Sequence, residues 1–288
     1  MQQAVDIAIP AITFLLLTAV GLDLTRDDFG RVRRQPLVVL TGVMAPLAVL
    51  PLVALGIVAA FSPAPAMRTG LLLIAASPIG GISNTYSYLA RASTALSVTL
   101  TGVSCLLAVV TIPLIARVFE AALGEALGFT APAGALVLQL SLMLALPVGL
   151  GMWVRHRWPT FANAHQPLVQ RLAFGSLALL IAFVIWAEFR SFATTVRSAV
   201  PMSAVFVAAS MAFGWTIGSI LRVSPRDRFT LAVEFSTRNV AVATAVAVTL
   251  LGRVDFAVFA TIYLLTEIPI MLVAIGAFRS ASRDPRRF

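Results

Sequence analysis

The amino-acid sequence predicts an all-α polytopic membrane protein, and three observations lead to that fold class. First, 59% of the 288 residues are hydrophobic and only 11% are charged, whereas a soluble domain carries about 25% charged residues. Second, apolar runs of about 20 residues, the length that spans a bilayer, recur along almost the whole chain. Third, a few ionisable residues lie inside these runs, where such residues usually mark the path of an ion or a solute.

Nine apolar segments follow one another, and we treat residues 1–288 as a single transmembrane domain. The first segment begins Met-Gln-Gln-Ala-Val-Asp, which lacks the basic leader of a signal peptide, so we expect it to be retained as a helix. The third and fourth segments nearly touch around Arg91. The expected membrane spans are about 5–24, 36–61, 68–90, 94–118, 130–154, 168–188, 197–221, 227–251 and 255–278.

The arginines predict the orientation of the chain in the membrane. All 21 basic residues are Arg, and with the N-terminus outside, 15 of them fall in cytoplasmic connections and five in outer ones. This bias matches the positive-inside rule, so we expect an outside N-terminus, a cytoplasmic C-terminus and an odd number of spans. The net charge of +9 does not indicate nucleic-acid binding, because the arginines lie in short gaps between apolar runs. Arg-only, Ala-rich usage is typical of a GC-rich bacterial genome, which indicates a bacterial inner membrane.

Two of the nine segments carry an interruption. The third contains Ser-Pro-Ile-Gly-Gly-Ile-Ser-Asn at 77–84, where proline cannot donate to the helix and paired glycines let the backbone unwind. The eighth contains the polar string from Glu234 to Asn239. Spans 1–4 and 6–9 form two groups that enter the membrane in opposite orientation, and each interruption falls in the third member of its group. Corresponding broken segments in inverted repeats indicate the binding site of a secondary transporter.

Polar residues near these interruptions suggest a site for a hard cation. Ser97 and Thr101 are four residues apart and share a helix face. Together with Ser83, Asn84 and Glu234 they supply five side-chain oxygen groups, one of them anionic, and oxygen is the ligand that hard cations prefer. A second interpretation stays open, in which the Ser97 and Thr101 hydroxyls bond to carbonyls of their own helix.

The chain resembles the bile acid:sodium symporter (SBF-like) family in these same residues. The match runs from the first segment to the last, and relative to ten-helix bacterial members the chain lacks the first helix. The resemblance implies sodium-coupled symport of a small organic anion by alternating access, with a bile acid-like, keto acid or pantoate-like carboxylate as substrate. The matching stretches are Gly-Leu-Asp-Leu-Thr-Arg-Asp-Asp-Phe at 21–29, Pro-Ile-Gly-Gly-Ile-Ser-Asn at 78–84, Ala-Leu-Ser-Val-Thr-Leu-Thr-Gly-Val-Ser at 95–104 and 234–239.

The resemblance also implies roles for single residues. Asn239 matches an asparagine that faces the substrate at the point where the broken helices cross. Gly80, Gly81 and Ile82 match a half-helix entrance whose amides can meet a substrate carboxylate. The positions that match the family's first sodium site are Ser83, Asn84, Ser97, Thr101 and Glu234.

The second sodium site of the family is where this chain departs from the pattern. Two glutamine ligands of that site fall at Pro46 and Arg238, so both side-chain ligands are absent and one is a fixed cation. Because like charges repel strongly in a low-dielectric site, our hypothesis is that Arg238 takes the place of the second sodium, which leaves one sodium ion or a change of coupling ion. We also include Arg238 among the candidate substrate-binding residues. Alternatively, Arg238 forms a structural ion pair with Glu234, four residues away on a continuous helix.

A third buried ionisable residue, Glu267, lies in the last segment. It can pair with Arg238, carry protons, or line the outer mouth and do little, and of these we favour the pair. We also include Glu267 among the candidate substrate-binding residues. A proton-coupled or uncoupled organic-anion carrier and a non-transporting membrane sensor are therefore the alternative functions. An intramembrane enzyme is not expected, because the chain lacks His-Glu-x-x-His, Gly-x-Ser-x-Gly and a paired Asp-rich motif, and Asp23 is expected at the membrane interface. The expected partners are a small organic anion, sodium and membrane lipid.

Overall fold

The computed structural model describes residues 2–25, 28, 30, 33–124 and 133–282. Within these ranges the chain is helical and contains no β-strand; one isolated antiparallel bridge joins Ile79 to Arg238. The helices are α1 (Gln2–Asp23), α3 (Pro36–Phe61), α4 (Pro65–Ala76), α5 (Ile82–Leu89), α6 (Thr94–Leu123), α7 (Ala133–Leu140), α8 (Leu146–Arg157), α9 (Pro159–Ala187), α10 (Phe189–Ile220), α11 (Pro225–Ser236), α12 (Val240–Ala245) and α13 (Phe256–Ala281), with π-helical turns η1 (Ser141–Ala145) and η2 (Val246–Leu250).

Local sequence explains several helix ends. Helices α3, α4, α9 and α11 begin with proline, whose missing N–H is not needed at the first helical position. Helix α6 ends at Leu123, and the following Gly124 has a φ of 67°, the left-handed conformation that glycine adopts at little cost. Ser224 caps α11, because its side chain accepts a hydrogen bond of 3.1 Å from the Asp227 N–H.

The described helices account for all of the apolar segments expected from the sequence. Six stretches are long and apolar enough to cross a membrane: Pro36–Phe61, Thr94–Leu123, Gly134–Arg157, Pro159–Ala187, Phe189–Ile220 and Phe256–Ala281. The shorter apolar helices Ala8–Asp23, Pro65–Ala76 and Val240–Leu250 fall in the first, third and eighth expected spans. The chain is therefore an all-α, multi-pass membrane protein, whereas nine crossings and inverted repeats remain predictions.

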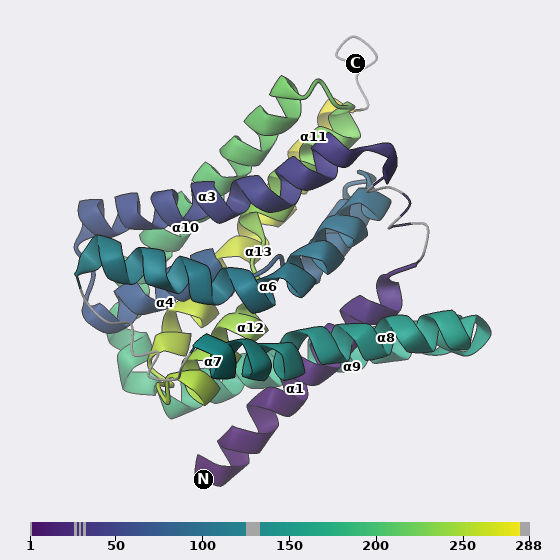
Figure 1. Cartoon of the computed structure of the whole chain (residues 1–288). Helices are drawn as coiled ribbons and strands as arrows, with labels where there is room; N and C mark the ends of the chain where they lie inside the picture. The colour runs from purple at the N-terminus through teal and green to yellow at the C-terminus, as the bar shows by residue number, and fades with distance from the viewer. Residues whose placement is uncertain (1, 26–27, 29, 31–32, 125–132, 283–288) are drawn as a thin grey trace.

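The helices lie in two groups. Helices α1, α7, α8 and α9 lie together in the lower part of Figure 1, and we call them the lower layer. Helices α3, α4, α6, α10, α11 and α13 lie above them, and α12 runs between the groups. Within the lower layer α1 and α8 touch backbone to backbone, because a methyl group at Gly21 would lie 2.2 Å from the Val148 carbonyl oxygen. Small residues permit this close approach of membrane helices.

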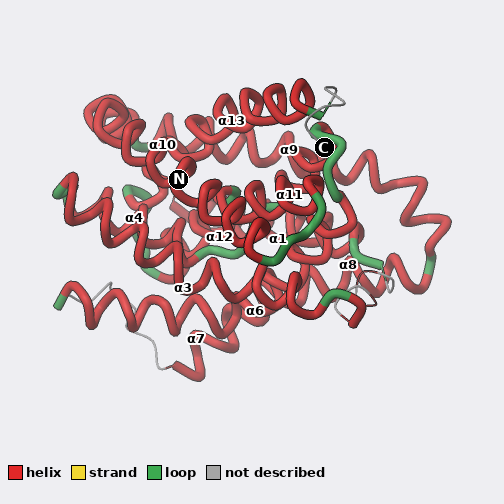
Figure 2. Tube along the Cα trace, turned by 90° about the horizontal axis from the view of Figure 1, so that it is seen from above, coloured by secondary structure: helices red, strands yellow, loops and turns green. Residues whose placement is uncertain are grey.

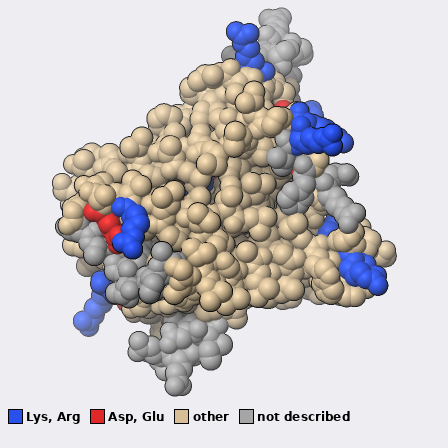
Figure 3. Space-filling model, viewed as in Figure 1, with Lys and Arg blue, Asp and Glu red and all other residues tan. Residues whose placement is uncertain are grey.

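The outer surface suits a lipid environment. On the face shown in Figure 3, charged side chains of the described residues are confined to the margins and the remainder is uncharged. Large apolar side chains such as Leu179 and Val273 are exposed. The interior, by contrast, holds polar groups that include Glu234, Arg238 and Glu267. The polar groups that could do chemistry are thus inside the helical bundle.

Candidate functional site

The first interrupted helix unwinds where the sequence predicts it. Helix α4 ends at Ala76, and α5 begins at Ile82 after a non-helical stretch that contains Pro78 and Gly80. The extended stretch is held from the side by α6, since the Ile79 N–H donates to Ser104 Oγ at 3.0 Å. This bond supplies a partner that the helix itself no longer provides, as unwound backbone inside a membrane requires.

The second interrupted helix unwinds without proline or glycine. Helix α11 ends at Ser236, and α12 begins after Asn239, whose Oδ1 accepts a hydrogen bond of 3.1 Å from the Val242 N–H. The Tyr263 hydroxyl of α13 supports the unwound stretch: it accepts the Arg238 N–H at 3.0 Å and donates to the Ser236 carbonyl. Side chains therefore satisfy the backbone groups that this break releases.

The two unwound stretches cross each other and pair. The Gly80 N–H donates to the Thr237 carbonyl at 3.1 Å, and the Asn239 N–H donates to the Pro78 carbonyl at 2.8 Å. A methyl group at Gly80 would lie 2.8 Å from the Arg238 carbonyl oxygen, so this close approach requires glycine. Figure 2 shows one such non-helical segment inside the bundle beside α12. We call this paired region the crossing.

The five predicted cation ligands lie together beside the crossing. Ser97 Oγ is within hydrogen-bond distance of a Glu234 carboxylate oxygen and, at 2.8 Å, of Asn84 Oδ1. Thr101 Oγ1 lies 3.1 Å from the other Glu234 oxygen and 3.2 Å from Ser83 Oγ. Every member of this oxygen cluster is buried. The hydroxyls of Ser97 and Thr101 therefore face the carboxylate and amide oxygens, not carbonyls of their own helix.

The composition of the oxygen cluster fits a hard cation. It contains hydroxyl, amide and carboxylate oxygens, and Ser97 has one proton for two acceptors, Asn84 Oδ1 and a Glu234 oxygen. A buried carboxylate is costly unless a positive charge compensates it. Among the described residues no group of three His, Cys, Asp or Glu side chains is present that could hold a metal ion. The cluster thus resembles a sodium-type site more than a transition-metal site.

Arg238 is buried without an ion pair. Its side chain is 1% exposed, and Nη2 donates to the Ser77 carbonyl, whereas Nε and Nη1 have no hydrogen-bond partner among the described residues. Both carboxylate oxygens of the fully buried Glu267 also lack a partner in that part of the chain.

Neither ion pair considered from the sequence forms in the described structure, whose salt bridges are Arg117–Glu120 and Arg253–Asp255. The predicted Glu234–Arg238 pair assumed a continuous helix, and the break after Ser236 removes the four-residue spacing on which it depended. The Arg238–Glu267 pair that we favoured is also wrong for this conformation, because the Arg238 guanidinium donates instead to the Ser77 carbonyl.

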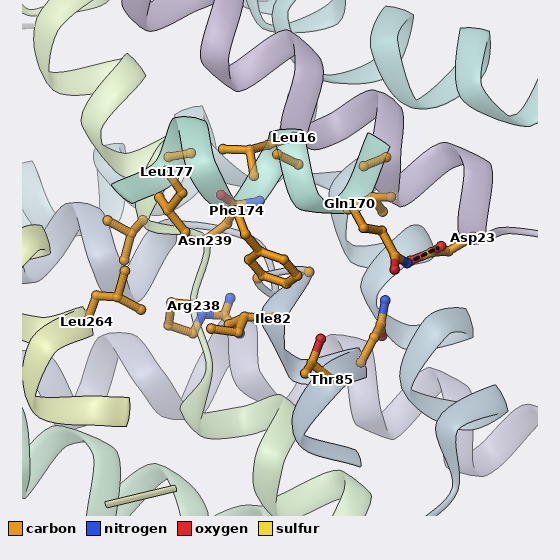
Figure 4. A pocket seen from close by; sticks show the side chains of 18 residues that line it. Leu16, Asp23, Ile82, Thr85, Gln170, Phe174, Leu177, Arg238, Asn239 and Leu264 are labelled. Atoms are coloured by element: carbon orange, nitrogen blue, oxygen red, sulfur yellow. Dashed lines mark hydrogen bonds between the residues drawn. The ribbon is translucent and has the colours of Figure 1, made fainter. Parts of the chain in front are cut away.

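A cavity of about 80 Å³ lies between the crossing and the lower layer (Figure 4). Gln170, Phe174 and Leu177 of α9 approach it from one side, opposite Ile82 and Arg238. Five of the predicted substrate residues line it: Gly80, Gly81, Ile82, Arg238 and Asn239.

Some predicted residues are placed differently. Glu267 is not among the residues that line the cavity, and Pro46 is buried in α3 and does not line it either. The Gly80 N–H is already engaged with Thr237, so the prediction for substrate-binding amides now depends on Gly81 and Ile82. Asn239 Oδ1 accepts the Val242 N–H and so caps α12, and the expected contact of Asn239 with a substrate stays a prediction.

Two residues of the site were missed or misplaced by sequence reasoning. Asp23, expected at the membrane interface, lines the cavity, and its Oδ1 accepts hydrogen bonds from Gln166 and Gln170. The four-residue spacing of those glutamines, which puts them on one helix face, was the available signal. Tyr263, which supports the second break, could not be recognised from the sequence, because a tyrosine within an apolar run is usually a core residue.

The fold and the site define a class: a polytopic membrane protein built around two interrupted, crossing helices with a buried oxygen cluster and a cavity beside them. The family that fits this class also matches the sequence. The profile of the sodium bile acid symporter family matches residues 10–195, so the chain belongs to that family. A symporter family is one of transporters and not of enzymes.

Individual relatives agree with this assignment. The chain is 25% identical over 225 residues to the probable sodium/metabolite cotransporter BASS1, chloroplastic, of Arabidopsis thaliana, covering 78% of this chain and 55% of the relative. It is 28% identical over 240 residues to sodium/bile acid cotransporter 4 of Rattus norvegicus, covering 81% and 54%. A shorter match of 105 residues is 37% identical to the uncharacterized sodium-dependent transporter YocS of Bacillus subtilis, covering 36% of this chain and 33% of that one. The chain thus spans about half the length of the first two relatives.

Proposed function

We propose that this protein is a secondary active transporter that carries a small organic anion together with sodium by alternating access. The observation that carries the proposal is the oxygen cluster around Glu234, which lies beside the crossing and next to a cavity. In this proposal Ser83, Asn84, Ser97, Thr101 and Glu234 hold one sodium ion as a co-transported substrate. The names of the relatives, which describe sodium/metabolite and sodium/bile acid cotransporters, support it.

The proposal includes an architecture. Nine membrane spans form one domain over residues 1–288, with spans 1–4 and 6–9 as inverted repeats. The two breaks, in the third and eighth expected spans, support this arrangement because they occupy corresponding positions. We place the protein in a bacterial inner membrane on its Arg-only, Ala-rich composition. The distribution of its arginines supports an outside N-terminus and a cytoplasmic C-terminus.

Asn84 supplies a physical link between the ion and the substrate. Its Oδ1 belongs to the oxygen cluster, and the residue also lines the cavity. A sodium ion bound by Asn84 and Ser83 would fix the first turn of α5, at whose start Gly81 and Ile82 line the cavity. Ion binding thereby favours the conformation that accepts the substrate, which is the differential affinity that coupling requires.

The sodium site is tested by replacing its only carboxylate. In Glu234→Gln we expect sodium to lose its stabilising effect on the purified protein, because an amide cannot compensate a cation. The melting temperature is measured in sodium chloride and in choline chloride for the wild type, for Glu234→Gln and for the control Glu188→Gln, whose side chain lies at the start of α10 away from the cluster. An unchanged sodium effect in Glu234→Gln would remove the basis of the proposal.

The second sodium site is proposed to be absent, with Arg238 and Pro46 at the positions of its glutamine ligands. We expect ²²Na⁺ binding to saturate at one ion per chain, because a buried guanidinium repels a neighbouring cation. The double variant Pro46→Gln, Arg238→Gln is expected to bind a second ion. Two ions per wild-type chain would contradict this part of the proposal.

One observation favours a second candidate function. Glu267 is a buried carboxyl group without a described partner, and such a group inside a membrane is a common proton carrier. A proton-coupled or uncoupled organic-anion carrier would therefore use the same fold. It is distinguished by uptake that follows a pH gradient, and not a sodium gradient, in proteoliposomes.

A further inference from the structure

Three arginines line a second cavity, which lies at the ends of three helices. Arg91 follows α5, Arg226 lies in the first turn of α11, and Arg279 lies in the last turn of α13. We call this space the arginine cavity. Its volume of about 160 Å³ is that of roughly five water molecules at about 30 Å³ each, so a small polar group has room among these basic residues.

The charge of the arginine cavity is not balanced within the described part of the chain. No described acidic residue lines the cavity, and the ion pairs Arg117–Glu120 and Arg253–Asp255 lie elsewhere. The acid beside Arg226 in the sequence is Asp227, whose Oδ2 accepts a hydrogen bond of 2.8 Å from the Ser224 hydroxyl. Because the three cations repel one another, an anion placed among them is bound favourably.

The backbone at Arg91 takes a conformation that is unusual for arginine. Its φ is 57°, in the left-handed region, at a position after a helix where glycine is the usual residue. A residue with a Cβ atom is less stable in this region by roughly 1 kcal/mol or more. The chain therefore has arginine at a place where glycine would fit better, which agrees with a role for the side chain.

An apolar groove meets the arginine cavity at Phe278, which lines both. We call it the α13 groove; it lies between α10, α11 and α13 and has a volume of about 660 Å³. The ring of Phe278 stacks on that of Phe229 in α11, with 4.3 Å between the ring centroids. Of the residues that line the groove, Ala212, Trp215 and Ala277 are exposed, so the groove opens to the outer surface.

The α13 groove has the length of part of an acyl chain. It follows one face of α13 from Ala274 to Ala281, which is roughly 10 Å along the helix axis. Half of the hydrocarbon core of a bilayer is about 15 Å thick. Since α13 is one of the helices long and apolar enough to cross a membrane, its groove is suited to a chain from one leaflet.

Arg228 adds a basic residue to the wall of the α13 groove. Its guanidinium carbon lies 5.5 Å from the centre of the Trp215 ring, and its Nε has no hydrogen-bond partner among the described residues. The contact with the ring holds the guanidinium in place without neutralising its charge. The groove thus combines an apolar lining with basic residues near the end that meets the arginine cavity.

This basic end lies on the side that the arginine distribution predicts to be cytoplasmic. In Figure 1 the end of α13 and the start of α11 lie near the point marked C, and Figure 3 shows basic side chains at the same upper margin. The positive-inside rule accounts for arginines on this side. It does not account for a cavity among them that continues into an apolar groove.

We propose that this surface binds an anionic phospholipid, with the headgroup phosphate in the arginine cavity and an acyl chain in the α13 groove. Basic pockets between membrane helices on the cytoplasmic side are the kind of site that recognises anionic headgroups. A soluble phosphate compound would occupy the arginine cavity alone, so the adjoining groove favours a lipid. The proposal goes beyond the transport function and does not depend on it.

The bound headgroup would connect two half-helices that carry the oxygen cluster. Arg91 follows α5, whose first turn contains Asn84, and Arg226 lies on α11, which contains Glu234. Binding of one phosphate to both arginines would therefore stabilise the position of α5 against α11. We expect this to raise the melting temperature of the protein.

The first experiment compares two lipids that differ in headgroup charge. The purified chain in a neutral detergent is titrated with phosphatidylglycerol or with phosphatidylcholine of the same acyl chains, and bound lipid is counted by native mass spectrometry. We expect phosphatidylglycerol to bind at least about tenfold more tightly, which is about 1.4 kcal/mol. It should also raise the melting temperature more than phosphatidylcholine does. Equal binding of the two lipids overturns the proposal.

A set of substitutions then locates the headgroup. In the triple variant Arg91→Gln, Arg226→Gln, Arg279→Gln the preference for phosphatidylglycerol should fall to within about twofold, because the phosphate loses its charged partners. The matched control removes three exposed arginines from the same predicted side that line neither space, namely Arg33, Arg34 and Arg171, each changed to Gln. An unchanged preference in the first variant, or an equal fall in both, overturns the proposal.

A second pair of variants tests the acyl chain. Ala277→Trp fills the α13 groove without changing a charge, and we expect it to weaken binding of phosphatidylglycerol at least about fivefold. Val273→Trp, one turn earlier and 74% exposed, is the control and should bind as the wild type does. An excess of soluble glycerol phosphate should leave the lipid bound. Normal binding by Ala277→Trp, or displacement by glycerol phosphate, would identify a soluble occupant and overturn the proposal.

These outcomes are separable from that of the transport function. The comparison of the two lipids needs no variant, so it stands even if the triple variant fails to fold. The sodium-dependent stabilisation that Glu234→Gln removes is measured without added lipid, so it tests the transport proposal independently.

Discussion

The two interrupted helices reach the same extended geometry from different sequences. Between α4 and α5 the chain contains Pro78 and Gly80, which break a helix by themselves. Between α11 and α12 it reads Thr-Arg-Asn, which carries no such residue. There the Asn239 cap and the Tyr263 hydroxyl replace the lost helical hydrogen bonds. One break is thus encoded locally, and the other depends on residues far away in the sequence.

The largest effect is expected where the two breaks touch. Gly80→Ala would place a methyl group 2.8 Å from the Arg238 carbonyl oxygen, which is backbone and cannot rotate away. We expect a loss of about 3 kcal/mol in the free energy of unfolding, the upper part of the range for overpacking. The control Gly81→Ala meets only a Val20 methyl group at 3.0 Å and should lose less. Denaturation in mixed micelles measures the free energy of unfolding of both variants. Equal losses would show that the close backbone contact at Gly80 does not limit the packing of the crossing.

The next effect tests the second break alone. Tyr263→Phe removes the hydroxyl that bonds to the Arg238 N–H and the Ser236 carbonyl, so both backbone groups lose a partner inside the membrane. We expect a loss of about 1 to 2 kcal/mol and faster hydrogen exchange at the Arg238 amide, with unchanged exchange at Ile79. Tyr86→Phe is the matched control, because the Tyr86 hydroxyl is buried and has no partner among the described residues. If both variants behave alike, Tyr263 does not support the break.

The smallest effect is expected at the locally encoded break. Pro78→Ala keeps the Pro78 carbonyl position that accepts the Asn239 N–H, and Gly80 remains. The change acts mainly by giving the unfolded chain more freedom, so we expect a loss of about 0.4 to 1 kcal/mol in the same denaturation assay. A loss above that of Tyr263→Phe would mean that proline, and not the paired backbone, maintains this break.

The fold could be predicted where it depends on local chemistry. Apolar runs located every long helix, and Pro78 with Gly80 located the first break. Helix boundaries were less accurate: α9 begins at Pro159 and not at 168, and α10 at Phe189 and not at 197. Hydropathy marks only the apolar part of a helix, whereas these helices continue through polar turns. The polar turn of α9 contains Gln166, which was therefore not connected with the site.

The site was predictable to the extent that its residues lie near the breaks. Ser83, Ser97 and Glu234 were selected because polar groups in apolar segments are rare, and the structure brings them together. The partners of Arg238 could not be predicted, because they depend on how the backbone turns after Ser236. Asp23 was misplaced for a similar reason: its environment is set by α9, which lies more than a hundred residues further along the chain.

The hydrogen bonds at the crossing have a mechanical consequence. Sliding one interrupted helix along the other would break the Gly80–Thr237 and Asn239–Pro78 bonds together. In the lower layer, the direct backbone contact between Gly21 and Val148 resists sliding of α1 along α8. Each part of the protein should therefore behave as one solid body. Any switch in the side to which the cavity opens has to occur at the seam between these bodies, which is where the cavity lies.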